Sequence, residues 1–211
     1  MMKIAVIGAS GMVGSRVVAE AVARGHEVDA YTRSGKEVEG ATAHKLQLAN
    51  TAETTAVINS HDFTVITVTG DRANLDYSEV SQAHADLIAA APQGRFLVVG
   101  GAGSLYENGA QAYTNWTEDN PYLAEASAFA KVYDRYIAEA GELKWSMISP
   151  SPVIAPGVRT GEVVLGSDEA VGQFVSAEDF AIAIVDEAEQ GSFTGKRFTA
   201  ASKNEQAAQG K

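Results

Sequence analysis

Three glycines near the N-terminus have the spacing of a phosphate-binding turn. The segment Gly8-Ala9-Ser10-Gly11-Met12-Val13-Gly14 follows the β-branched run Lys3–Ile7 and opens an amphipathic stretch that ends near Arg24. In such a unit the first glycine permits a sharp turn, the second lets the backbone approach a pyrophosphate, and the third lets the helix pack closely. We expect the amides at the helix start to bind dinucleotide phosphates, with contacts from Gly8, Ala9, Ser10, Gly11, Met12 and Val13. The alternative is a strand–helix turn that binds nothing.

The end of the second predicted strand bears on which dinucleotide binds. NAD enzymes usually end this strand with a carboxylate that hydrogen-bonds the ribose 2′-hydroxyl. Here the strand Glu27–Thr32 contains Asp29, which comes too early, and Arg33 follows directly. A guanidinium can pair with a 2′-phosphate that a carboxylate would repel. We therefore favour NADPH over NADH, although NADH stays possible and Arg33 could be a solvated arginine.

Composition excludes several other classes of protein. The 211 residues carry a net charge of -11, which argues against nucleic acid as a partner because phosphate backbones need a basic face. The chain has no cysteine, and its four histidines lack metal-ligand spacing, so we expect no metal site. No apolar window is long enough for a membrane span, and the N-terminal apolar run is too short for a signal peptide. We expect a cytoplasmic protein that does not bind membranes.

Apolar periodicity predicts strands that alternate with helices. The predicted strands are Lys3–Ile7, Glu27–Thr32, Thr42–Leu48, Phe63–Val68, Arg95–Val99, Lys144–Ile148 and a last one near Arg197–Thr199. The predicted helices are Val13–Arg24, Leu75–Ala91, Leu123–Ala140 and one that begins at a capping box, Ser176–Asp179. This alternation predicts an α/β, Rossmann-type doubly wound parallel sheet in a single domain, residues 1–201, with a frayed polar tail, residues 202–211.

In such a sheet the functional residues follow the carboxyl ends of the strands. Thr69, Gly70 and Asp71 follow the fourth strand and should pass near the pyrophosphate and its ribose. Gly100 and Gly101 follow the fifth strand and are also expected to contact the cofactor.

Several blocks in one order make the chain similar to a known family. They are Gly8–Gly14, Val98–Leu105, Ile148–Pro152, Pro156–Gly161 and Val175–Ala181. With them the chain resembles the atypical short-chain dehydrogenase/reductases of the NAD(P)H-binding or NADH-flavin-reductase-like kind, relatives of biliverdin-reductase-B-like and NmrA-like proteins. Only about sixty residues follow the sixth strand. The resemblance therefore implies a small C-terminal substrate cap and an open pocket.

The resemblance also implies roles for individual residues. Short-chain dehydrogenases use a serine or threonine after strand five, and a tyrosine four residues before a lysine. Ser104 and Lys131 match the first and last of these positions, and Lys131 would also hold the cofactor ribose. Ser127 stands where the tyrosine is expected, so the usual acid/base pair is incomplete, and Tyr122 is the remaining candidate for substrate contact.

Two further segments match cofactor-binding positions of the family. Gln47 and Leu48 occupy the segment where relatives often carry an aspartate that binds the adenine amine, and an amide can accept the same hydrogen bond. Ser149 and Pro150 begin a proline-stiffened loop that the resemblance places beside the nicotinamide.

Three functions are compatible with these features. The first is an NAD(P)H-dependent reductase of a planar small-molecule acceptor such as a flavin or quinone, which needs no tyrosine acid. The second is an NmrA-like redox sensor that binds the dinucleotide with little turnover. The third is a reductase or isomerase of a small carbonyl compound. The chain is expected to act as a monomer or homodimer.

Overall fold

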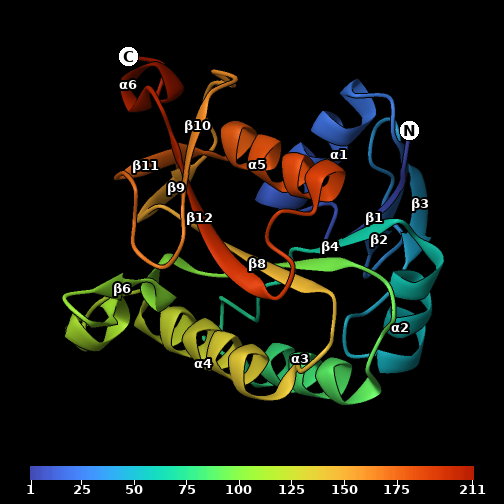
Figure 1. Ribbon diagram of the computed structural model, residues 1–211, viewed down its shortest axis with the longest axis horizontal. Helices are drawn as coiled ribbons and strands as arrows, with labels where there is room; N and C mark the ends of the chain where they lie inside the picture. Colours follow the sequence, from blue (N-terminus) through green and yellow to red (C-terminus); the bar gives the residue numbers. More distant parts are fainter.

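An eight-stranded sheet runs through the computed structural model, which describes residues 1–211 (Figure 1). Its strand order is β10-β12-β8-β5-β4-β1-β2-β3, and every neighbouring pair is parallel except β10 with β12. The strands are β1 Lys3–Ile7, β2 Glu27–Thr32, β3 Thr42–Lys45, β4 Phe63–Ile66, β5 Phe96–Val99, β8 Trp145–Pro150, β10 Val163–Gly166 and β12 Lys196–Ser202. The expected α/β doubly wound sheet is confirmed.

The direction of winding reverses at β1. From β1 the chain moves outward to β2 and β3, and then returns to β4 on the other side of β1. The segments after β1 and β4 therefore diverge to opposite faces of the sheet. A crevice opens between them at the carboxyl ends of the strands, which is where ligands bind in open α/β sheets.

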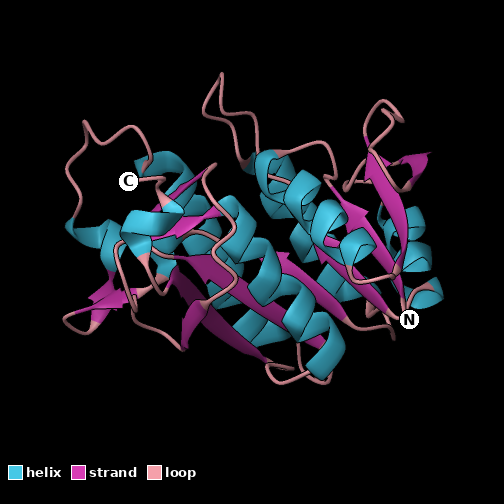
Figure 2. Ribbon diagram, turned by 90° about the horizontal axis from the view of Figure 1, so that it is seen from above, coloured by secondary structure: helices cyan, strands magenta, loops and turns pink.

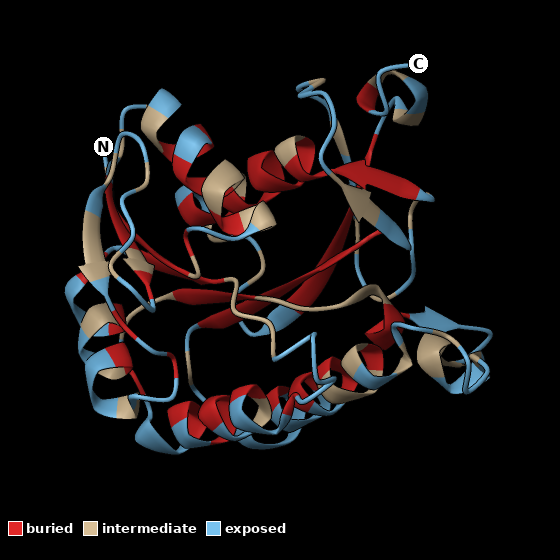
Figure 3. Ribbon diagram, turned by 180° about the vertical axis from the view of Figure 1, so that it is seen from behind, coloured by how far each residue is buried: buried red, intermediate tan, exposed pale blue.

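Helices cover both faces of the sheet (Figures 1 and 2). One face carries α1 Met12–Ala23 and α5 Ala177–Gln190, and the other carries α2 Thr51–Ser60, α3 Ser78–Ala90 and α4 Leu123–Glu139. The central strands are buried between these layers (Figure 3). Each layer buries its own apolar cluster against the sheet, as a near-continuous β-branched strand requires. No helix combines the length and apolar character needed to cross a membrane.

The helix α2 was not predicted from the sequence. It contains three threonines, which are weak helix formers, and only Thr54 and Ile58 are buried, so its apolar periodicity is faint. The helix depends on local polar contacts. Asn50 caps its first turn by accepting from the amide of Glu53, and the Thr54 hydroxyl donates to the carbonyl of Leu48 at 3.2 Å.

Short elements extend the chain beyond the predicted ones. The crossover from β5 to α4 holds the 3₁₀ turns η1 Ala102–Ser104 and η2 Ala112–Asn115 and the hairpin β6 Tyr106–Glu107 with β7 Ala110–Gln111. After β8, the strand β9 Val153–Ala155 pairs in parallel with β11 Phe174–Ser176.

The expectation of a frayed C-terminus is wrong for the helix α6, Glu205–Ala208. Asn204 caps this helix, Ala208 is fully buried, and its carbonyl accepts from the amide of Val158 at 2.8 Å. The carboxylate of Glu205 also accepts from the amide of Gln173. The polar composition of this segment did not predict these contacts, because each of them involves a backbone group.

The predicted capping box is half right. The Ser176 hydroxyl accepts from the amide of Asp179 at 3.0 Å, as expected at the start of α5. The Asp179 carboxylate does not return to the first turn, however. It is fully buried and accepts from Thr160, from the amide of Gly161 and from the hydroxyl of Ser202. It therefore fixes the loop after β9 against α5 and β12.

A buried histidine on the inner face of α3 makes stability depend on pH. His84 is almost fully buried, with Nδ1 3.1 Å from the Tyr136 hydroxyl and no partner for Nε2. Burial lowers the pKa of His84 to about 4. An unfolded histidine has a pKa of about 6.5, so between these values the unfolded chain binds a proton that the folded chain excludes.

We therefore expect the free energy of unfolding to fall as the pH drops from about 6.5 to about 4. This single group contributes about 3 kcal/mol to the loss. Urea unfolding of His84→Leu across this range should show a flatter pH dependence than the wild type, whereas Tyr136→Phe should keep the wild-type slope. Parallel curves for His84→Leu and the wild type would contradict the assignment.

Candidate functional site

The turn after β1 contains backbone amides that donate no hydrogen bond to any group in the chain. Two strands hold it in place: the Tyr31 carbonyl accepts from the amides of Gly8 and Ala9, and the Thr67 hydroxyl donates to the Gly8 carbonyl at 3.0 Å. The helix α1 begins after Gly11 without a side-chain cap. The amides of Ser10, Met12 and Val13 make no hydrogen bond within the chain. This is the donor set that an anion requires at a helix start.

The three glycines of this turn are required for different reasons. Gly8 has φ of +91°, which favours glycine. A Cβ at Gly14 would overlap the Gly8 carbonyl, so this glycine lets α1 pack against the turn. A Cβ at Gly11 would meet only the Gly8 carbonyl oxygen, at 3.3 Å, and φ there is -76°. Folding therefore does not require glycine at position 11, whereas the close approach of a phosphate to this turn would.

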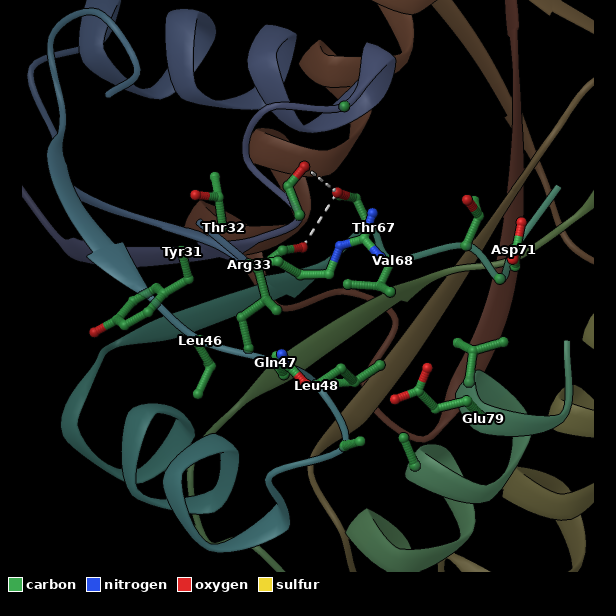
Figure 4. A pocket seen from close by; sticks show the side chains of 18 of the residues that line it. Tyr31, Thr32, Arg33, Leu46, Gln47, Leu48, Thr67, Val68, Asp71 and Glu79 are labelled. Atoms are coloured by element: carbon green, nitrogen blue, oxygen red, sulfur yellow. Dashed lines mark hydrogen bonds between the residues drawn. The ribbon is translucent and has the colours of Figure 1, made fainter. Parts of the chain in front are cut away.

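A cavity of about 810 Å³ opens in front of this turn (Figure 4). Its volume lies within the range of small-molecule sites. Of the predicted cofactor contacts, the cavity is lined by Gly8, Ser10, Gly11, Arg33, Gln47, Leu48, Thr69 and Gly70. They come from the segments after β1, β2, β3 and β4, at the reversal of strand order. Among the other residues of the turn, Ala9 is buried, and Met12 and Val13 are half-buried at the start of α1.

Of the two arginines that line this cavity, Arg72 is paired with Glu125, and Arg33, directly after β2, is the one without an ion pair. Arg33 is exposed, has no ion pair, and extends across the cavity toward Val68 in Figure 4. Asp29 does not line the cavity. Its carboxylate is buried and bonded to Lys3, His44 and His61 at 2.8 to 3.1 Å. Although burial opposes the change, hydrogen bonds from His61, His44 and Lys3 lower the pKa of Asp29 to about 2. The end of β2 thus offers a guanidinium and no carboxylate.

Acidic side chains line the cavity on the wall formed by the loop between β4 and α3 and by the first turn of α3. Asp71, Asp76 and Glu79 line the cavity on this side. Hydrogen bonds from Asn74 and Ala73, together with the positive charge of Arg33, lower the pKa of Asp71. Arg72 makes a bidentate ion pair with Glu125, at 2.9 and 2.6 Å, that joins this loop to the first turn of α4.

A second set of predicted residues gathers at the ends of β5 and β8. The amide of Gly100 donates to the carbonyl of Ile148 at 2.8 Å, and a Cβ at Gly100 would contact the Ser149 hydroxyl. Gly101 opens η1, and Pro150 ends β8. These residues do not line the cavity of Figure 4, but they share its edge of the sheet, because β5 and β8 run parallel to β4.

Ser104 is placed in this set with its hydroxyl already engaged. The side chain is fully buried, and Oγ donates to the Gly101 carbonyl at 2.8 Å. The buried guanidinium of Arg197 donates to the Ser104 carbonyl at 2.6 Å and to Oγ at 3.2 Å. A hydroxyl has one proton, so Ser104 cannot protonate a substrate while this bond to Gly101 stands.

The other predicted catalytic residues lie on α4. Lys131 is exposed with no ion pair, and Ser127, one turn earlier, is half-buried. Tyr122 precedes the first turn of α4 and is 67% exposed. The remaining tyrosines of α4 serve the interior: Tyr133 contacts Asp168 and packs under the Arg197 guanidinium, and Tyr136 contacts His84.

Sequence reasoning missed half of the cavity wall. The missed residues are Ile7, Tyr31, Thr32, Leu46, Ala49, Thr67, Val68, Arg72, Asp76, Glu79, Val80 and Ala83. Half of them follow the ends of β3 and β4, so their position after predicted strands was an available signal. The part contributed by α3 had no signal, because Val80 and Ala83 are ordinary core residues of a helix.

Comparison with known proteins shows which family has this fold and this glycine turn. A family model described as NAD(P)H-binding matches residues 8–190. The protein YwnB of Bacillus subtilis is 32% identical and covers 97% of this chain and 100% of its own. A solved structure from Streptococcus pneumoniae, provisionally named an NADH-flavin reductase, is 29% identical with a TM-score of 0.85, covering 96% of this chain and 100% of that one.

A second solved structure carries a different activity name. It comes from Bacteroides thetaiotaomicron, is provisionally named an epimerase, and is 32% identical with a TM-score of 0.82, covering 95% of this chain and 96% of that one. One fold therefore carries two activity names among these structures, and the reaction has to be argued from the site.

The glycine turn gives a direct test of phosphate binding. We expect Gly11→Ala to lower the affinity for NADPH at least ~10-fold, because the methyl group occupies the approach to the amides, with little change in melting temperature. Gly14→Ala should instead lower the melting temperature, since its Cβ overlaps the Gly8 carbonyl. Calorimetric titration and thermal unfolding measure the two effects. Unchanged NADPH affinity in Gly11→Ala would contradict phosphate binding at this turn.

Proposed function

Because this chain belongs to the NAD(P)H-binding family of atypical short-chain dehydrogenase/reductases, we propose that it is an NADPH-dependent reductase of a planar acceptor such as a flavin or quinone. The proposal has two parts, the phosphorylated cofactor and the acceptor, and different residues support each.

The groups around the cavity fit a dinucleotide. Three free amides at the start of α1 offer hydrogen bonds to a diphosphate, with the partial positive charge of the helix behind them. Arg33 stands where the ribose 2′ position is read in this fold, and its guanidinium has no competing ion pair. A 2′-phosphate would gain a charge-assisted bidentate contact here. These features support NADPH as the cofactor, with NADH binding more weakly.

The choice of a planar acceptor rests on one observation: the side chains in the family's catalytic positions are not available to donate a proton to a substrate. The Ser104 hydroxyl donates within the chain, and serine replaces tyrosine at position 127. Carbonyl reduction needs an acid positioned on the new alkoxide. The chain offers none in the family's usual position, which disfavours a carbonyl substrate.

A planar acceptor removes this requirement. Reduced nicotinamide supplies a hydride when bound, and a proton from water completes the reduction of a flavin or quinone. What the chain must then do is orient the acceptor and limit access of water. We propose that Gly100, Gly101, Ser149 and Pro150 form the floor beneath the nicotinamide, that Lys131 reaches its ribose, and that the exposed ring of Tyr122 contacts the acceptor.

The same observation favours one other function. A protein without an acid on its substrate could bind the dinucleotide and change its contacts with a partner, as an NmrA-like sensor does. Such a sensor would bind NADPH without turning it over.

The cofactor part of the proposal predicts the effect of removing one guanidinium. Arg33→Ala should weaken NADPH ~10-fold or more and NADH less than ~3-fold, because only the former carries a 2′-phosphate. Arg135→Ala, on the exposed side of α4, is the matched control and should change neither. Calorimetric titration of both dinucleotides decides the point. An equal loss for NADPH and NADH would remove the case for the phosphorylated form.

The acceptor part predicts the outcome of a turnover screen. Oxidation of NADPH, followed at 340 nm, should accelerate on adding FMN or a quinone and should not respond to small aldehydes or ketones. Tight NADPH binding with no turnover on any acceptor would support the sensor instead. Turnover restricted to carbonyl compounds would overturn the planar acceptor.

A further inference from the structure

The part of the cavity between the segment after β3 and the start of α3 has apolar walls. On one side lie Leu46 and Leu48, from the segment after β3, and on the other Val80 and Ala83, from the start of α3. All four side chains are at most 6% exposed. Two apolar walls that face each other suit the two faces of a flat aromatic ring.

The unpaired charge on this wall of the cavity is negative, because the cation that lines it, Arg72, is paired with Glu125. Glu79 projects from the first turn of α3, and its carboxylate points toward Leu48 in Figure 4. Asp71 and Asp76 line the same wall. A phosphate would be repelled here by like charge, whereas an amine or hydroxyl would be bound. The diphosphate therefore belongs at the glycine turn and the base at the α3 end.

Glu79 is exposed, and its carboxylate has no ion pair and no hydrogen bond within the chain. The carboxylates beside it are engaged, Asp71 with Asn74 and Asp76 with Ser78. Gln47, across the cavity, also has a side chain without an internal partner. Glu79 is thus the charged acceptor on this wall that remains available to a ligand.

We propose that Glu79 determines which nucleobase the cavity accepts, by taking a hydrogen bond from the exocyclic amine of adenine. This inference rests on the nicotinamide dinucleotide of the proposed function and adds the residue that reads its base. A base with a carbonyl at that position, such as hypoxanthine, would turn an oxygen toward the carboxylate and lose affinity. An unpaired charged acceptor discriminates strongly between such ligands.

A purely structural role for Glu79 predicts something else. A carboxylate in the first turn of a helix interacts favourably with the helix dipole. In that role its removal would change stability and would affect all dinucleotides alike. Glu53, exposed in the first turn of α2 and outside the cavity, has only this structural role and is the matched control.

The test compares NADPH with its reduced hypoxanthine analogue, which has a carbonyl in place of the adenine amine and a proton on the neighbouring N1. Calorimetric titration of the wild type should favour NADPH by ~10-fold or more. In Glu79→Gln the ratio should fall below ~3-fold, because an amide can donate to the hypoxanthine carbonyl as well as accept from the amine. Glu53→Gln should keep the wild-type ratio. Circular dichroism and melting temperature check that each variant folds.

Three outcomes would overturn the assignment. Equal affinities of the wild type for both dinucleotides would show that the base is not read. A wild-type ratio that persists in Glu79→Gln would place the reader elsewhere. An equal loss for both dinucleotides in Glu79→Gln would assign the carboxylate to a ribose hydroxyl or to the helix terminus. If the wild type bound neither dinucleotide, the proposed cofactor itself would fail, which is a distinct result.

Discussion

The site depends on backbone amides that are left without partners at the start of α1. A helix start always has such amides, and most proteins satisfy them with a capping side chain or with water. Here Gly11 occupies the cap position and supplies no side chain, so the amides of Ser10, Met12 and Val13 stay available. Hydrogen bonds to the neighbouring strands hold the rest of this turn in place.

The turn is fixed by strands that lie on either side of β1. The carbonyl of Tyr31, on β2, holds the amides of Gly8 and Ala9, and the hydroxyl of Thr67, after β4, holds the carbonyl of Gly8. Because β2 and β4 are the neighbours of β1, the reversal of strand order both creates the crevice and anchors the turn that faces it. The same two strands deliver Arg33 and Gly70 to the cavity. The strand order that opens the crevice therefore also positions the residues that line it.

A feature of the fold or of the site could be predicted from the sequence when residues close together in the chain encode it. The glycine turn, α1 and the apolar strands were predictable because spacing and periodicity encode them within a few residues of each other. The helix α2 was not, since its threonine-rich sequence gains stability from contacts with the preceding segment, such as Thr54 with Leu48. The pairing of α6 with Val158, the burial of Ser104 over Arg197 and the approach of α3 to the cavity join segments far apart in the chain. No local pattern records such contacts. The family's usual serine position thus predicted where Ser104 lies but not that its hydroxyl donates to Gly101.

The central claim is that free amides after β1 donate hydrogen bonds to a diphosphate. Nuclear magnetic resonance of the ¹⁵N-labelled chain during NADPH titration tests it most directly. The account predicts that the amide signals of Ser10, Met12 and Val13 move farthest and saturate together, because direct hydrogen bonds to a charged oxygen deshield the amide proton. Saturable binding that leaves these three signals in place while others move would contradict it.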